Sequence, residues 1–104
     1  MSLSTHVLDA ARGRPAEGVP VRLERREDGG YRGLAEARTD ADGRIRDWGG
    51  AELGAGTYRL VFDTAGLSDF YPEVAVAFVV ADPGQHHHVP LLLSPFAYST
   101  YRGS

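Results

Sequence analysis

The chain has 104 residues, a net charge of −3 and no cysteine. This length allows one domain with one hydrophobic core, so residues 1–104 are predicted to form a single domain. The lack of cysteine excludes disulfides and thiolate metal sites, and the eleven arginines are scattered among acids, unlike the basic stripe of a nucleic-acid-binding protein.

Apolar residues recur along the chain with a period of two, which predicts short, half-buried β-strands. The run over 74–81 is almost wholly apolar, so we expect its strand to be covered on both faces. In chain order, the predicted strands cover residues 3–9, 19–24, 33–39, 45–48, 58–63, 74–81, 89–93 and 96–101.

Thirteen Gly and six Pro punctuate these runs, a composition typical of a β-sandwich or barrel. We therefore predict an all-β sandwich of two four-stranded sheets, with one short helix near 64–70 that Pro72 ends. No apolar run is long enough to cross a bilayer, and the first residues lack the pattern of a signal peptide. We expect a cytoplasmic protein with no membrane partner.

Four histidines and one arginine are candidates for chemistry, and each also has an ordinary explanation. His6 can be an ordinary histidine at the edge of a sheet. Arg44 follows the turn at 42–43, where its guanidinium is either solvated or donates hydrogen bonds to a substrate oxygen. His86 and His88 share one strand face, with His87 on the other. A metal site needs a third ligand that this strand does not offer, so we predict none.

Strand alternation also places the polar candidates beside apolar neighbours. In three strands, a face that carries His6, His88 or Tyr101 also carries small or aliphatic residues. If those faces meet, they form a mostly apolar pocket with a few polar groups, which is the usual composition of a ligand site.

Several segments together resemble the hydroxyisourate hydrolase family, the transthyretin-related enzymes of urate breakdown. The residues that carry this resemblance are LSTHVLD at 3–9, G-x-P-A at 13–16, DGR at 42–44, FYPEV at 70–74, HVPLLLSP at 88–95 and the terminal YRGS at 101–104. The terminal motif is the most specific of them, because transthyretin, the hormone carrier of the same fold, lacks it. The likeness covers essentially the whole chain.

The resemblance implies a transthyretin-like sandwich that assembles as a homotetramer, a dimer of dimers, with clefts between the dimers. It implies hydrolysis of the cyclic amide bond of 5-hydroxyisourate to 2-oxo-4-hydroxy-4-carboxy-5-ureidoimidazoline, without metal or cofactor. The catalytic residues would be His6, Arg44, His88 and Ser104, with His6, Arg44 and Tyr101 binding substrate. Either His6 or His88 would accept a proton from water while Arg44 stabilises the oxyanion, and His88 is the preferred base.

A carrier of a small ligand in the same cleft is the alternative function. A carrier needs an open channel with small residues at its floor, and Tyr101 would obstruct such a channel. The histidines and arginine are also types that a catalytic site uses, so the hydrolase is the preferred interpretation.

Overall fold

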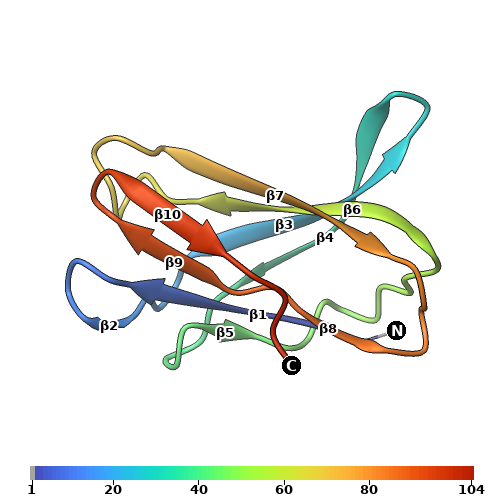
Figure 1. Ribbon diagram of the computed structural model, residues 1–104, viewed down its shortest axis with the longest axis horizontal. Coiled ribbons are helices and arrows are strands. Elements are labelled where there is room, and N and C mark those ends of the chain that lie inside the picture. Colours follow the sequence, from blue (N-terminus) through green and yellow to red (C-terminus); the bar gives the residue numbers. More distant parts are fainter. Residues whose placement is uncertain (1) are drawn as a thin grey trace.

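Residues 2–104, which the computed structural model describes, form ten β-strands in two sheets (Figure 1). One sheet has the order β10-β9-β1-β2, with β5 and β8 also paired to β1, and the other has the order β4-β3-β6-β7. The strands are β1 (Ser2–Asp9), β2 (Arg14–Pro15), β3 (Pro20–Glu27), β4 (Gly30–Arg38), β5 (Arg44–Ile45), β6 (Gly56–Asp63), β7 (Glu73–Val80), β8 (His86–His88), β9 (Leu91–Ser94) and β10 (Ala97–Thr100).

The first sheet is organised around β1, because β1 is its most connected strand. β8 and β9 both run parallel to β1, along its first and last residues respectively, while β2 and β5 pair antiparallel with it. Pro90, which has no N–H to give a sheet, lies in the gap between β8 and β9. β8 and β9 follow one another along one side of β1, and β5 and β2 follow one another along the other side. The six strands therefore fill the space of about four full-length strands, close to the predicted four-stranded sheet.

The core lies between the two sheets and is lined by alternate residues of their strands. Val7 from β1 and Leu91 from β9 meet Leu23, Leu60 and other side chains of the second sheet, and all four are fully buried. The alternate residues of β1 and β8, including His6 and His88, therefore lie on the opposite, outer face of the first sheet.

The all-β sandwich is confirmed, but the short helix predicted near 64–70 is wrong, since residues 2–104 contain no helix. The segment is a turn in which the amides of Leu67 and Ser68 donate to the Thr64 carbonyl at 2.9 and 3.0 Å. The hydroxyl of Ser68 then accepts the amides of Phe70 and Tyr71. A serine that captures backbone N–H groups in this way competes with a helix.

The expectation that the strand at 74–81 is covered on both faces is also wrong for this chain. β7 is an edge strand, and its residues alternate between buried and exposed. Val74 and Val80 lie in the core, whereas Val79 is 66% exposed. A buried face plus an apolar outer face produces the same continuous apolar run as a strand buried on both sides.

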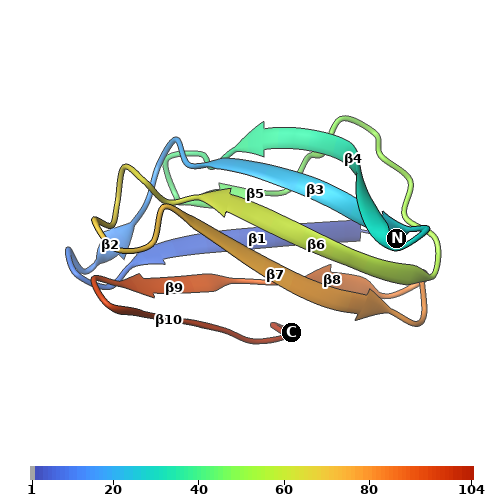
Figure 2. The same ribbon diagram turned by 90° about the horizontal axis from the view of Figure 1, so that it is seen from above.

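No helix in residues 2–104 is long and apolar enough to cross a membrane. The last residues of the chain run beside β8 (Figure 1), where Gly103 forms an isolated antiparallel bridge to His88. In the perpendicular view, β10 and the C-terminus lie at one margin of the molecule (Figure 2). The fold therefore brings the first strand, the β8 histidines and the terminal motif to one region.

Candidate functional site

Pairing between β1 and β5 places Arg44 beside His6. The two residues are directly opposite in the antiparallel register, so their side chains project from the same face of the sheet. The Val7 amide also donates to the Gly43 carbonyl at 2.7 Å, which fastens the preceding turn to β1. The neighbourhood of His6 and Arg44 thus follows from the backbone.

A carboxylate shapes the turn that delivers Arg44. Asp40 Oδ1 accepts the amides of Asp42 and Arg44 at 2.9 and 3.0 Å, and the Gly43 amide donates to the Asp40 carbonyl. The Arg44 amide is the main reason why the pKa of Asp40 is lowered, against a smaller opposing effect of burial. Asp40 thus supports the position of Arg44, a role that the sequence analysis did not assign, although Asp-Ala-Asp-Gly at 40–43 is a recognisable turn signal.

His88 is held by contacts on both sides. Ser4 lies opposite it in the parallel register, and the Ser4 hydroxyl is 2.7 Å from His88 Nδ1. On the other side, the Gly103 amide donates to the His88 carbonyl at 2.8 Å. With Nδ1 engaged by Ser4, the imidazole presents Nε2 as its free ring nitrogen.

The surroundings of His88 favour the neutral imidazole. Partial burial is the largest cause that lowers the pKa of His88 below its ordinary 6.5, followed by the charges of Arg44, His6 and His86. A hydrogen bond with the Ser4 backbone opposes them but does not cancel them. His88 is therefore available as a proton acceptor at neutral pH.

His6 carries a buried polar atom without a partner. Its Nε2 is shielded from solvent yet forms no hydrogen bond within residues 2–104. A buried nitrogen left unpaired costs free energy, so such an atom in a native fold usually has a ligand or water as its partner. His6, Arg44 and His88 together form what we call the outer-face cluster.

The two other histidines of β8 take opposite sides of the sheet. His87 is buried on the core side, where its Nδ1 is 3.1 Å from the Gln85 carbonyl. His86 lies on the outer side, bonded to the hydroxyls of Ser2 and Ser4 at 2.5 and 2.9 Å. No group of three or more potential metal ligands occurs in the described part of the chain. His86 is thus a serine-linked neighbour of His88.

Tyr101 and Ser104 belong to the terminal motif that runs beside β8. No hydrogen bond within residues 2–104 joins either to His6, Arg44 or His88. Tyr101 is exposed and lies at the rim of an apolar hollow of about 310 Å³ between the edges of the two sheets. The hollow is lined by Val76, Ala77, Phe78, Val79, His87, Val89, Thr100, Tyr101 and Arg102.

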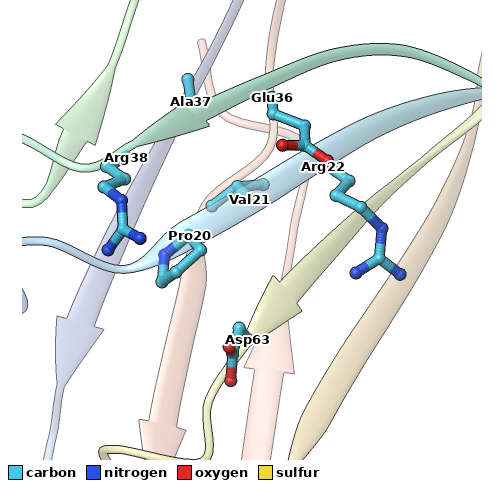
Figure 3. Close-up of a pocket in the computed structure, with 7 residues that line it drawn as sticks. All are labelled: Pro20, Val21, Arg22, Glu36, Ala37, Arg38 and Asp63. Carbon is cyan, nitrogen blue, oxygen red and sulfur yellow. The ribbon is translucent and has the colours of Figure 1, made fainter.

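A second hollow, of about 360 Å³, lies at the end of the other sheet (Figure 3). It is lined by Pro20, Val21, Arg22, Glu36, Ala37, Arg38 and Asp63. Its charged groups are two arginines and two carboxylates, with no histidine among them. The hollow therefore lacks the imidazoles that distinguish the outer-face cluster.

Two packed sheets with a histidine–arginine cluster on one outer face define a transthyretin-like β-sandwich. The chain belongs to the HIUase/Transthyretin family, whose model matches residues 3–103.

Individual relatives include a hydrolase and a transthyretin bound to thyroxine. The chain is 51% identical over 112 residues to a 5-hydroxyisourate hydrolase of Caulobacter vibrioides, covering 98% of this chain and 97% of the relative. The structure of 5-hydroxyisourate hydrolase from Klebsiella pneumoniae matches with a TM-score of 0.84 and 42% identity, covering 100% of both chains. Sea bream transthyretin in complex with thyroxine has a TM-score of 0.86 and 34% identity, covering 97% and 93%.

Proposed function

We propose that this protein is an enzyme of urate breakdown that hydrolyses 5-hydroxyisourate. The observation that carries the proposal is the outer-face cluster, in which strand register places Arg44 directly opposite His6 and places His88 on the same face of the sheet. Burial is the largest cause of the lowered pKa of His88, and the charges of Arg44 and His6 add to it. Relatives of nearly equal length and 42–51% identity are named as this hydrolase.

In the mechanism we propose, His88 is the general base. Its Nε2 takes a proton from water as the water oxygen attacks a ring carbonyl of the substrate. Arg44, a cationic donor, stabilises the negative charge that forms on the carbonyl oxygen. The intermediate then collapses, the ring C–N bond breaks, and the nitrogen receives the proton held on His88 Nε2. The buried Nε2 of His6 is available to hydrogen-bond the substrate.

The terminal motif is part of the same proposal. Tyr101 would bind substrate and Ser104 would assist catalysis, by orienting a histidine or arginine. The support is the bridge between Gly103 and His88, which holds residues 102–104 alongside β8. Removing Ser104 alone, or replacing Tyr101 by Phe, tests each role through the turnover rate.

We further propose that residues 1–104 act as one domain in a homotetramer, a dimer of dimers, in the cytoplasm. β7 and β10 are edge strands, and exposed apolar side chains gather on and around them. These are Phe70, Val79, Phe96, Tyr98 and Tyr101. Unpaired edges with apolar neighbours favour association. Light scattering coupled to size exclusion tests the tetramer, and cell fractionation tests the location.

A ligand carrier without catalysis is the second candidate function, favoured by the equally close fit to transthyretin. The two are separated by generating 5-hydroxyisourate from urate with a urate oxidase and following its ultraviolet decay. The hydrolase predicts decay well above the spontaneous rate. It also predicts that His6→Ala, Arg44→Ala and His88→Ala each lower turnover by about 100-fold or more without changing assembly. Decay at the spontaneous rate would support the carrier.

A further inference from the structure

A run of hydrogen bonds connects the ring of His88 to the exposed rim of the sheet. The Ser4 hydroxyl is 2.7 Å from His88 Nδ1 and 2.9 Å from His86 Nε2, and His86 Nδ1 is 2.5 Å from the Ser2 hydroxyl. Ser4 is buried, whereas His86 and Ser2 are exposed. The pairing of β1 with β8 aligns all four side chains, so the run is a product of strand register.

The single hydroxyl proton of Ser4 couples the two imidazoles. If Ser4 donates to one ring, it must accept from the other, because a hydroxyl has one hydrogen. In one arrangement Ser4 donates to His86 Nε2 and His88 donates from Nδ1, which leaves His88 Nε2 unprotonated. In the other arrangement Ser4 donates to His88 Nδ1, and His88 carries its proton on Nε2.

We propose that His86 is a positioning residue that relays protons for His88, an inference that rests on the proposed hydrolase function. When water gives a proton to His88 Nε2, the Nδ1 proton passes to Ser4 and the Ser4 proton passes to His86 Nε2. The Nδ1 proton of His86 then passes to Ser2, whose own proton leaves to solvent. Each hop forms one N–H or O–H bond and breaks one, and the relay runs in reverse to restore the first arrangement.

The reaction gives such a relay a purpose. While the tetrahedral intermediate lasts, a base without such a relay would hold the proton taken from water as a partly buried positive charge. His88 is partly buried, and burial is also the main cause of its lowered pKa. A half-buried base that avoids the charged state benefits from an exit for its proton.

Other charged groups around His88 do not offer this route. The guanidinium of Arg44, on β5, has no acceptor atom for a proton, and His6, on β1, has no hydrogen bond at its buried Nε2. Arg102, beyond β10, bonds the Gln85 side chain instead. Within residues 2–104, His86 is the one titratable side chain that hydrogen bonds connect to His88.

The test compares steady-state kinetics of the wild type, His86→Gln and Ser4→Ala between pH 5.5 and 8.5. A Gln side chain can still form a hydrogen bond with Ser4, but it cannot accept a proton from Ser4 and release another to Ser2. We expect kcat of both variants to fall about 10-fold or more, with a smaller change in KM. We also expect imidazole buffer to restore part of the lost rate, after subtraction of spontaneous decay. His87→Gln removes an imidazole from the core side of the same strand and should retain wild-type kcat without any imidazole effect.

A second readout needs no activity. Ring ¹⁵N spectra of the histidines report the tautomer and pKa of His88, and His86→Gln should raise that pKa because it removes a neighbouring like charge. An active wild type with unchanged kcat, imidazole response and His88 titration in His86→Gln would overturn the relay alone. An inactive wild type would overturn the proposed function instead, whatever the His88 titration shows.

Discussion

Gly103 is the residue whose size the site constrains most directly. A Cβ at position 103 would lie 2.3 Å from His88 Cδ2 and 3.0 Å from His88 Cγ. Gly103→Ala must therefore shift the imidazole that we propose as the base or the terminal segment that is paired with it. A displacement near 1 Å costs about 100-fold in rate, so we expect a loss of that order, measured as kcat/KM.

The matched control is Gly33→Ala, because a Cβ at Gly33 meets nothing within 4 Å. That variant should keep wild-type turnover. Gly103→Ala should unfold at nearly the wild-type urea concentration, since the residue lies on the exposed C-terminal segment. Wild-type turnover by Gly103→Ala would contradict the placement of His88 at the reaction centre.

The identity of individual site residues was more accessible from sequence than their contacts. Alternation and motif indicated His6, Arg44 and His88 as candidates, and the structure places these three on one face. The links through Ser4 and His86 were missed, because they depend on a register between strands more than 80 residues apart. A period-two pattern assigns faces within a strand but does not set that register.

The turn before β5 is the local element on which Arg44 depends. Gly43 has φ +75°, and a Cβ there would lie 2.6 Å from the Val7 carbonyl oxygen, a backbone atom that cannot move freely. We expect Gly43→Ala to lower the free energy of unfolding by about 2 kcal/mol or more, from left-handed strain plus the clash. Urea unfolding measures the loss.

A substitution at Gly49 separates the backbone strain from the steric clash. It has φ +71°, but a Cβ there meets nothing within 4 Å. Gly49→Ala should therefore lose only the conformational contribution, about 1 kcal/mol. Equal losses for the two variants would show that the contact with Val7 does not constrain the turn.

Elements were predictable where local pattern alone decides them. The strands around Val21 and Leu60 follow their alternation. The helix near 64–70 and the coverage of β7 were wrong, since each depends on tertiary context. Ser68 captures the amides that a helix would need, and the position of β7 at a sheet edge leaves one of its faces exposed.

At the scale of the whole molecule, the fold lowers the pKa values of ionisable groups in both sheets and in a connecting turn. The pKa values of Asp9, Glu24 and Asp40 are lowered below their ordinary 3.8 to 4.5, and that of His88 below 6.5. For Glu24 the main cause is the hydrogen bond from Arg59, at 2.6 Å. The folded chain thus binds fewer protons at these four groups than the unfolded chain does.

Because all four pKa values are lowered, we expect the free energy of unfolding to decrease as the pH falls. A lowered pKa contributes stability that is present above the unfolded value and lost as the pH falls through the folded value. The decline should begin below pH 6.5 with His88 and steepen below about pH 4.5, when the carboxylates protonate. Urea unfolding between pH 7 and 3.5 measures this decrease.

Arg59→Met returns the pKa of Glu24 toward its ordinary value, so the variant should be less stable at pH 7 but show a shallower decline of the free energy of unfolding with falling pH. A free energy of unfolding that stays constant from pH 7 to 3.5 would refute the prediction, because a fold that binds fewer protons must lose stability when protons are supplied.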